Sequence, residues 1–316
     1  MTPNRQNCTD YEISDPSQLS SSPTVSVLML AYNHEAYVRQ AIESILAQEV
    51  EFPFEIVVGE DCSTDGTREI LLEYQALRPD LVRIVSSDAN VGMNRNLARI
   101  LTTSRGAFIA ICECDDYWVS SVKLAKQVSF LQSTRGASLV FSDRLVVSGS
   151  KVSSTCYEQR NYSLKDILEG FIPPTQTMMW RRSDGLIGKI LAYPDNPSGD
   201  RLIAYHCALL GSIAKDSFVS AAYRVTGDGV WSSLPKKDHR RLKYLRLAEF
   251  HRQMGVNDAS SLARCVEGLL LDSFHSIRKM DGAFAALGDV VYFTKLAGIS
   301  RALAAVCGKF LKRSRQ

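Results

Sequence analysis

The sequence predicts an α/β protein in which a mainly parallel sheet is flanked by helices and followed by a helical C-terminal extension. Between residues 24 and 225, short β-rich runs alternate with segments whose apolar residues recur at helical spacing. The first strands of this pattern end in polar clusters. Basic residues concentrate after residue 235, which sets the last part of the chain apart.

The first half of the chain shows the clearest alternation of strands and helices. Residues 25–31 form a mostly apolar run typical of a buried strand, and apolar residues then follow helical spacing up to residue 46. Pro79 ends the second predicted helix. The predicted elements after the first strand are a helix around residues 38–46, strand 55–59, helix 67–77, strand 81–85, a helix that includes 97–101, and strand 107–112.

The pattern is looser after residue 138, and it contains no internal repeat. The elements predicted there are a short strand at 139–142, a hairpin around Gly149, a helix at 164–168, a strand at 177–180, a helix at 199–210 and a final strand at 218–225.

Length and composition exclude several classes of protein. The 316 residues can bury a sizeable core, and 45% hydrophobic with 22% charged residues excludes disordered, collagenous and coiled-coil chains. Eight cysteines without a CxxC pair or zinc-finger spacing predict reduced thiols and a cytoplasmic location. Neither a signal peptide nor an 18-residue apolar run is present, so we expect no export and no membrane span.

Charge is distributed unevenly along the chain. Residues 235–316 hold 16 Lys and Arg against 7 Asp and Glu, whereas the preceding residues hold 21 against 27. This asymmetry predicts a boundary near Pro235. We therefore expect a disordered N-terminal segment over residues 1–23, an α/β domain over 24–234 and a basic helical extension over 235–316.

The end of this extension has two interpretations. Residues 295–315 contain six basic residues and no acidic one, interleaved with apolar residues at roughly helical spacing. The segment is either an amphipathic helix that lies on an anionic membrane surface or a helical cap with a solvated basic face. It lacks a known nucleic-acid-binding motif, so we expect no nucleic-acid partner.

Polar clusters follow three of the predicted strands, at residues 32–33, 60–61 and 113–116. In an open α/β sheet the ligand crevice lies outside the carboxyl ends of the strands, so these clusters are expected to converge on one site. Residues 113–116, named the acidic turn below, place Asp115 and Asp116 side by side. Adjacent carboxylates repel each other, which indicates a neutralising cation such as Mg²⁺ or Mn²⁺. The alternative is that both residues cap a following helix.

The cluster over residues 60–67 allows a similar choice. Asp61 stands at a strand end, where a carboxylate can accept hydrogen bonds from a base or a ribose hydroxyl. Asp65 and Thr67 are better explained as the turn and cap of the next helix.

Taken together, these segments resemble a family 2 glycosyltransferase with the Rossmann-like GT-A fold. The resembling stretches occur in the family's order and spacing over about residues 23–130, with a weaker likeness to about Trp231. They are residues 26–33, 41–48, 60–67 and 90–92, and residues 113–118 followed by Lys123 and Gln127. Each stretch is weak alone, and the combination is specific.

The resemblance implies roles for individual residues. Tyr32 and Asp61 would hold the nucleoside, with the backbone of Ala31 against it. Asn90 and Arg95 would line the nucleotide pocket, with Arg99 as the competitor for the arginine position. Two further implied roles concern the diphosphate: Asp115 and Asp116 would bind the metal and the sugar nucleotide, with Asp116 as the direct metal ligand. His34 is set aside as a solvated residue at a helix start.

Sugar transfer with inversion needs a carboxylate that takes the proton of the acceptor hydroxyl. The resemblance implies Asp200 for this role, while its position before the helix at 202–210 also suits an N-cap. Thr226 is a departure, because related chains often have His there after Tyr-Arg. In those chains the His can reach the metal or the diphosphate. Here Asp228 or water would take its place, or the metal is held less tightly.

The leading hypothesis is therefore an inverting, metal-dependent glycosyltransferase. Its donor would be a nucleotide-diphosphate sugar, with a UDP-sugar favoured, and its acceptor a saccharide or glycolipid in cell-surface polysaccharide or glycolipid assembly. A nicotinamide-dependent oxidoreductase is excluded because no glycine-rich turn follows the first strand. The alternative that stays open is a non-catalytic sugar-nucleotide-binding or scaffold protein, which Thr226 favours and the four aspartates at 61, 115, 116 and 200 oppose.

Overall fold

The computed structural model describes residues 8–193, 198–227, 246–247, 249–251 and 253–254. The chain divides into two compact units, one of residues 1–164 with 172–226 and the other of residues 165–171 with 227–316. The second unit thus begins before Pro235 and includes a short segment from the middle of the chain. Within that unit, a ring nitrogen of His251 lies 3.1 Å from the carbonyl oxygen of Leu168.

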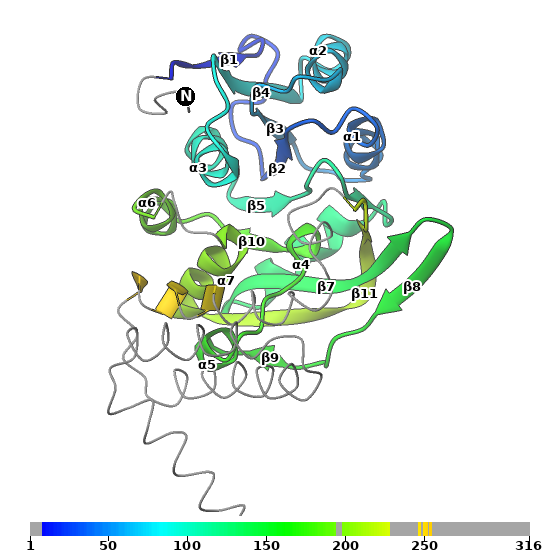
Figure 1. Cartoon of the computed structure of the whole chain (residues 1–316). Coiled ribbons are helices and arrows are strands. Elements are labelled where there is room, and N and C mark those ends of the chain that lie inside the picture. The colour runs from blue at the N-terminus through cyan, green and yellow to red at the C-terminus, as the bar shows by residue number, and fades with distance from the viewer. Residues whose placement is uncertain (1–7, 194–197, 228–245, 248, 252, 255–316) are drawn as a thin grey trace, which may run out of the picture. The chain divides into compact units, whose positions relative to one another are not determined.

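The first unit is built on a mixed sheet of eleven strands (Figure 1). Four parallel strands form its first half, in the order β4 (Val82–Ser87), β3 (Phe54–Glu60), β2 (Val25–Ala31) and β5 (Phe108–Ile111). The chain runs outward from β2 to β4 and then returns to place β5 on the other side of β2. The carboxyl ends of β2 and β5 are therefore the switch point at which such sheets bind ligands.

Helices cover both faces of these four strands, as Figure 1 shows. α1 (Val38–Leu46) and α2 (Thr67–Leu77) follow strands that step in one direction, whereas α3 (Met93–Thr103) precedes the return to β5. Because parallel crossovers are right-handed, the reversal of direction puts α3 on the opposite face. α1 buries the stripe predicted by its spacing, which consists of Val38, Ala41, Ile42 and Ile45.

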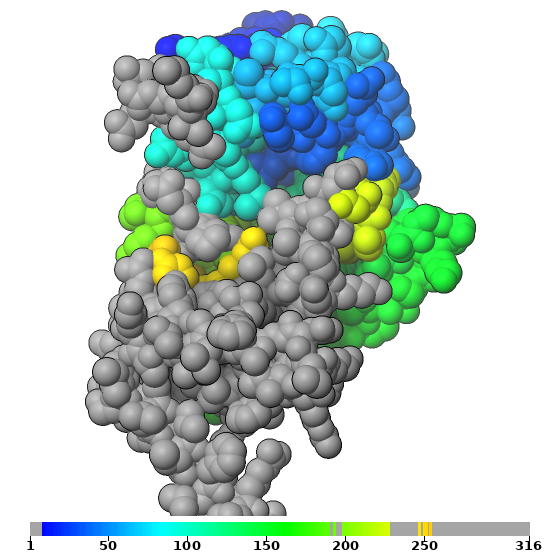
Figure 2. All heavy atoms as spheres, viewed as in Figure 1, coloured from blue at the N-terminus to red at the C-terminus, as the bar shows by residue number. Residues whose placement is uncertain are grey.

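The other strands extend the sheet beyond β5. β10 (Met179–Arg181) runs antiparallel between β5 and β7 (Ala137–Ser148), and β11 (Ser212–Arg224) lies parallel to β7. β6 (Tyr117–Trp118) and β9 (Asn161–Tyr162) pair with β11. β8 (Lys151–Thr155) completes a hairpin with β7, which turns at Gly149 with a φ of +57° and projects from this unit (Figures 1 and 2).

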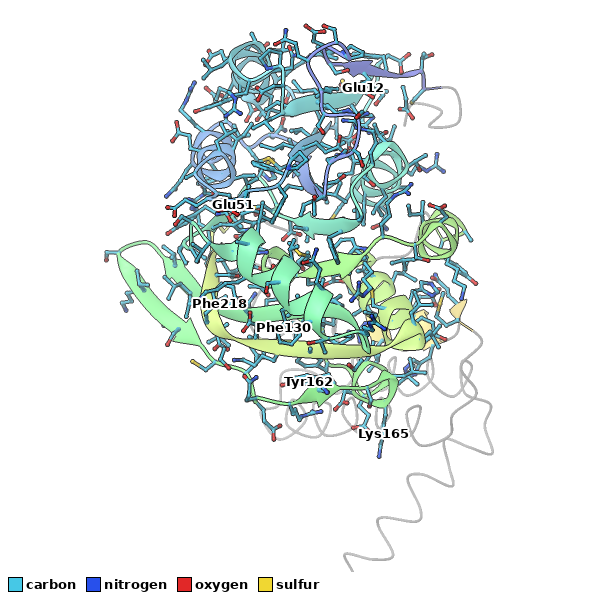
Figure 3. The ribbon with its side chains drawn as sticks, turned by 180° about the vertical axis from the view of Figure 1, so that it is seen from behind. Glu12, Glu51, Phe130, Tyr162, Lys165 and Phe218 are labelled. Atoms are coloured by element: carbon cyan, nitrogen blue, oxygen red, sulfur yellow. The ribbon has the colours of Figure 1, made fainter. Side chains whose placement is uncertain are left out.

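Three further helices and one 3₁₀ turn of this unit accompany the second half of the sheet. They are α4 (Lys123–Ser133), the 3₁₀ turn η1 (Thr175–Thr177), α6 (Asp184–Leu191) and α7 (Gly199–Leu210). From Lys165 on, α5 (Leu164–Leu168) belongs to the second unit. α4 crosses the face of the sheet that is turned toward the viewer in Figure 3, where Phe130 of α4 and Phe218 of β11 are labelled. No helix among the described residues is long and apolar enough to cross a bilayer.

Packing between β3 and α3 leaves no room for a side chain at Gly59. The Asn96 side chain donates a 2.7 Å hydrogen bond to the Gly59 carbonyl. A Cβ atom on Gly59 would lie 2.1 Å from Asn96 Oδ1 and 2.9 Å from a methyl group of Ile100. The helix therefore rests directly on the backbone of the strand.

The prediction of disorder over residues 1–23 is wrong for β1 (Asp10–Ile13), which pairs antiparallel with β4. Glu12 of β1 accepts hydrogen bonds of 2.8 and 2.9 Å from Arg83 of β4. This pairing covers the edge of the sheet, whose backbone groups would otherwise be open to another chain. The strand is short and polar, so no hydrophobic pattern marks it in the sequence.

Other differences from the predicted elements are smaller. β11 begins at Ser212 instead of residue 218, and the sequence did not predict β6 or α6. The hairpin at Gly149 and the helices at 164–168 and 199–210 are confirmed. Most of the predicted extension, including residues 295–315, lies outside the described residues.

Candidate active site

The loops after β2 and β3 are tied together by hydrogen bonds. The backbone N–H of Asn33 donates to the Ser63 hydroxyl, and the Asn33 side chain accepts a 2.8 Å bond from the N–H of Thr64. Asn33 and Cys62 have φ values of +55° and +59°, which are uncommon for residues other than glycine. The carboxyl ends of these two strands thus form one preformed edge.

Asp61 is almost completely buried at the end of β3. Its two carboxylate oxygens accept 2.8 and 2.9 Å hydrogen bonds from the N–H groups of Val91 and Gly92. The Asn90 side chain donates a 3.1 Å bond to the Asp61 carbonyl. Burial raises the pKa of Asp61 above its usual value, although these hydrogen bonds oppose the shift. The structure therefore brings Asp61 and Asn90 together, with the Asp61 carboxylate holding the loop at residues 90–92.

The sequence left two arginines of α3, Arg95 and Arg99, as alternatives for the nucleotide pocket. In the structure, Arg99 is the one that lies beside Asp61. An Arg99 guanidinium nitrogen lies 3.7 Å from the Asp61 carboxylate, and the same group donates 2.6 and 2.7 Å bonds to the Glu60 carbonyl and the Ser87 hydroxyl. Arg95 lies in the first turn of α3 and is partly buried. Its predicted contact with the nucleotide stays a prediction.

Ala31 and Tyr32 occupy the end of β2. The carbonyl of the buried Ala31 accepts the backbone N–H of Asp61 at 3.0 Å. Tyr32 is 44% exposed, which is unusual for a large aromatic side chain and leaves its ring open to stack on a base. Asp65 forms the turn expected from the sequence, because it accepts the N–H of Thr67 at 3.0 Å, while the N-cap residue of α2 is Gly66.

The acidic turn does not cap a helix. It leads into the short strand β6, and the next helix, α4, begins only at Lys123. The alternative that Asp115 and Asp116 are helix caps is therefore wrong. Arg224 at the end of β11 fixes the turn: its backbone N–H donates to Asp116 Oδ1 at 2.7 Å, and its side chain donates to the Asp115 carbonyl at 2.9 Å.

Carboxylates crowd around the acidic turn. Asp116 is fully buried, and its Oδ2 atom has no hydrogen-bond partner. Burial and the neighbouring Asp115 charge raise the pKa of Asp116 well above its usual value. The pKa of Glu113 is also well above its usual value, because of burial and the charges of Asp116, Asp115 and Asp200. This crowding indicates a site that is completed by positive charge.

Asp200 belongs to the same cluster, since its charge acts on Glu113. It is the second residue of α7, whose N-cap is Ser198, and its carboxylate accepts the N–H of Arg201 at 2.7 Å. The start of α7 packs on α3, where a Cβ on Gly199 would lie 3.1 Å from Leu97. Asp200 is therefore not the N-cap residue, and the fold brings it to the acidic turn from a distant part of the sequence.

The sequence analysis missed three groups at this site. Arg144 of β7 and Tyr223 of β11 face the acidic turn, and burial together with its negative charges raises the pKa of Tyr223. His34 was set aside as a solvated residue, yet its Nδ1 atom is buried without a partner and Asp115 and Asp65 are close enough to act on its pKa. Burial lowers that pKa. In the sequence, only the position of His34 directly after Tyr-Asn could have indicated that it lies close to the acidic turn.

The residues of the acidic turn fit a divalent cation. Asp115 and Asp116 offer hard oxygen donors, and Asp116 Oδ2 is buried with nothing to satisfy it. No group of three His, Cys, Asp or Glu side chains in the described part of the chain is arranged to hold a metal. Further ligands would therefore come from the diphosphate of a bound nucleotide and from water. Asp228, the predicted substitute for a third ligand, lies outside the described residues.

Comparison with known proteins decides the family. The model of the family described as Glycosyl transferase family 2 matches residues 26–186. The chain belongs to this family. An uncharacterised protein of Mycobacterium tuberculosis is 32% identical over 217 residues, which cover 66% of this chain and 61% of that protein. The chain thus spans less than two thirds of the length of this relative.

Solved structures of other proteins show the same fold. TarS of Staphylococcus aureus (residues 1–349, in complex with UDP-GlcNAc) has a TM-score of 0.55 at 20% identity, covering 82% of this chain and 88% of that chain. The mannosyltransferase PcManGT of Pyrobaculum calidifontis, in complex with GDP-Man and Mn²⁺, has a TM-score of 0.55 at 15% identity, covering 90% and 86%. These similarities confirm the predicted GT-A fold. In sequence, TarS, named a poly(ribitol-phosphate) beta-N-acetylglucosaminyltransferase, is 34% identical over 96 residues, covering 29% of this chain and 16% of TarS.

Proposed function

We propose that this family 2 glycosyltransferase is an active, inverting, metal-dependent enzyme that moves a sugar from a nucleotide-diphosphate sugar to a hydroxyl acceptor. The observation that carries the proposal is the buried, unpartnered Oδ2 atom of Asp116, which lies in a cluster with Glu113, Asp115 and Asp200. A structure that served only as a scaffold would gain nothing from a cluster of carboxylates that repel each other.

Each carboxylate then has a distinct task. Asp200 accepts the proton of the acceptor hydroxyl as the acceptor oxygen bonds to the anomeric carbon and the bond from that carbon to the diphosphate breaks. Asp115 and Asp116 would hold Mn²⁺ or Mg²⁺, and the ion would supply positive charge next to the diphosphate. Arg224 keeps the acidic turn in place through its contacts with both residues.

The nucleoside would lie at the ends of β2 and β3. There the exposed ring of Tyr32 offers a stacking surface, and the edge formed with Asp61 and Asn90 is already built. Arg95 would line this pocket from α3. We favour a UDP-sugar, because TarS, which shares sequence as well as fold with this chain, is described in complex with UDP-GlcNAc.

The acceptor is proposed to be a saccharide or glycolipid in the assembly of a cell-surface polymer. The name of TarS, a poly(ribitol-phosphate) beta-N-acetylglucosaminyltransferase, supports a polymer that carries hydroxyl groups as the acceptor, and a 29% identical relative in Bacillus subtilis is named as a putative teichuronic acid biosynthesis glycosyltransferase. We propose that the enzyme acts at the cytoplasmic side of a membrane. The six basic residues at 295–315, which are interleaved with apolar ones, would suit contact with anionic lipid there.

The test begins with the wild-type chain, a panel of UDP-, GDP-, dTDP- and CMP-sugars, and Mn²⁺. A donor that binds should raise the melting temperature by mass action. Hydrolysis of that donor is then measured with Mn²⁺ and with a chelator. Hydrolysis that disappears with the chelator supports the proposal. Donor binding without release of the free nucleotide, even with a panel of saccharide acceptors, would favour the non-catalytic alternative.

A further inference from the structure

Two arginines reach the acidic turn from neighbouring strands, and they differ in how they are bound. Arg224 of β11 is fully engaged: its guanidinium donates to the Asp115 carbonyl and to the Gln40 side chain, and it stacks on the rings of Tyr37 and Tyr117. This arginine fixes the turn and has little left to offer a ligand.

Arg144 of β7 has a different environment. Its backbone lies opposite Ala221 of β11, and its guanidinium carbon lies 4.8 Å from the centre of the Tyr223 ring. Tyr223 lies next to Arg224, whose backbone binds Asp116, and the guanidinium of Arg144 is close enough to the acidic turn to oppose the upward pKa shifts of Glu113 and Asp116. Its Nε–H is nevertheless buried without a hydrogen-bond partner, and no ion pair within 4.0 Å involves Arg144 among the described residues.

A buried donor without a partner is unfavourable, and such groups in a native structure usually have a role. Arg144 could simply balance the negative charge of the cluster. A balancing charge, however, gains most from direct contact with a carboxylate, and Arg144 makes none. The planar guanidinium group suits two parallel hydrogen bonds to phosphate oxygens, and the stacked Tyr223 ring holds its plane.

We propose that Arg144 binds the diphosphate of the nucleotide-sugar donor and stabilises it as the leaving group. When the bond between the anomeric carbon and the diphosphate breaks, the electron pair stays on the phosphate oxygen, and the N–H groups of Arg144 donate to the oxygens that gain this charge. The acceptor proton goes to Asp200. This inference rests on the proposed function and adds a residue of β7 to the donor site.

The test compares Arg144→Gln with wild type by isothermal titration in Mn²⁺, using UDP and UMP, and GDP and GMP. Loss of a charge-assisted contact with the terminal phosphate should weaken diphosphate binding roughly tenfold to a hundredfold. Binding of the monophosphates should change by less than about twofold on the same scale. Donor turnover should fall as well.

The matched control is Arg160→Gln. Arg160 also stacks on a tyrosine, 3.9 Å from the centre of the Tyr162 ring, but it pairs with Glu158 at the surface and lies outside the site. This variant should keep wild-type affinity for all four nucleotides. If both variants lose diphosphate affinity equally, the effect is not specific to Arg144 and the inference is wrong.

The remaining outcomes separate this inference from the proposed function. Unchanged diphosphate affinity in Arg144→Gln, or an equal loss for monophosphate and diphosphate, rejects Arg144 as a diphosphate ligand while the proposed function stands. Failure of the wild type to bind any of the diphosphates rejects both. If Arg144→Gln does not fold, Arg144→Lys provides the same comparison, because Lys keeps the charge but loses the planar pair of donors; wild-type diphosphate affinity in that variant overturns the inference.

Discussion

The ends of β2 and β3 differ from the acidic turn in how their buried polar atoms are satisfied. At the β3 end, Asp61 receives two backbone N–H groups, and the Asn33 loop is bonded to the Ser63 loop. Around the acidic turn, Asp116 Oδ2 and Arg144 Nε are buried without partners. The carboxylate of Asp61 is satisfied without a ligand, whereas the buried polar atoms at the acidic turn, and the Nδ1 atom of His34 that Asp115 affects, are not.

This difference indicates where binding energy is used. The edge at the ends of β2 and β3 is preformed, so binding of the nucleoside at this proposed site would lose little conformational entropy. Around the acidic turn, the repulsion between carboxylates and the two unpartnered atoms, the acceptor Asp116 Oδ2 and the donor Arg144 Nε, destabilise the folded chain, and a metal with a diphosphate would remove both costs. Substitutions at the β3 end should therefore affect mainly the free energy of unfolding, and substitutions at the acidic turn should affect mainly donor binding and turnover.

The largest effect is expected for Asp200→Asn. Loss of a positioned general base should lower turnover by roughly 10²-fold to 10⁴-fold. Donor affinity should stay near wild type, because Asp200 is assigned to the acceptor side. The measurement is steady-state transfer alongside titration of the donor.

Asn is an informative replacement at this position. In the structure the Asp200 carboxylate accepts the N–H of Arg201, and an Asn side chain can accept the same hydrogen bond. A purely structural residue would then tolerate the change. Turnover within about threefold of wild type would reject Asp200 as the base and direct attention to Asp195 or Asp228, which lie outside the described residues.

The second prediction compares Asp116→Asn with Asp61→Asn. Asp116→Asn removes buried negative charge, so it should leave stability unchanged or higher while it abolishes the Mn²⁺-dependent part of donor affinity. Asp61→Asn places an NH₂ group against the N–H groups of Val91 and Gly92, so it should lower the free energy of unfolding by about 1–3 kcal/mol. Urea denaturation and donor titration with and without Mn²⁺ measure both effects. The comparison between the regions fails if Asp116→Asn destabilises the chain as much as Asp61→Asn does.

The third prediction concerns the pH dependence of stability. Lys123 of α4 is fully buried, bonds to Gln127 at 2.6 Å, and has a pKa lowered by burial from 10.5 to about 7. Between these two values the unfolded chain holds a proton that the folded chain lacks, so stability rises with pH. Below pH 7 the full destabilisation is present. Lys123→Met should remove up to about 1.4 kcal/mol per pH unit from this slope.

Urea denaturation of wild type and Lys123→Met from pH 6 to pH 10 provides this measurement. The difference between the two curves isolates Lys123 from other titrating groups. Gln127 loses its partner in the variant, which shifts the whole curve but not its slope. Parallel curves would show that Lys123 stays protonated in the folded chain.

The smallest effect is expected from removal of residues 295–316, which are not among the described residues. Turnover of a soluble acceptor should stay largely intact, while sedimentation with vesicles that contain anionic lipid should decrease, because six basic residues are lost. Neutral vesicles are the control. Equal sedimentation of the full and shortened chains with anionic vesicles would favour the structural cap.

The sequence was sufficient to place the residues that follow strongly apolar strands. Tyr32 and Asp61 come directly after the neighbouring strands β2 and β3, and Asp115 and Asp116 lie in the turn that follows β5, so their convergence at the carboxyl ends of these strands follows from the topology. The role of Asp200 as the base was predicted only from the family resemblance, because a single Gly-Asp at a helix start has several explanations.

Contacts between distant segments could not be predicted in this way. Arg95 and Arg99 are four residues apart and share one face of α3, so spacing alone could not show which one reaches Asp61. Arg224 and Asp116 are separated by 108 residues. Arg144 lies within a strand whose pattern gives no sign of a functional side chain. β1 is a four-residue polar segment whose pairing depends on Arg83 of another strand.

The contact between Gly59 and Asn96 has a consequence for redesign of donor specificity. A single methyl group at residue 59 would push α3 from β3, and α3 carries the Arg99 that lies beside Asp61. Changes at the contact between Gly59 and Asn96 would therefore alter the surroundings of Asp61, where we propose that the nucleoside binds, together with the stability of the unit. A library aimed at new bases should therefore vary the exposed Tyr32 and its surroundings and keep positions 59, 96 and 99 fixed.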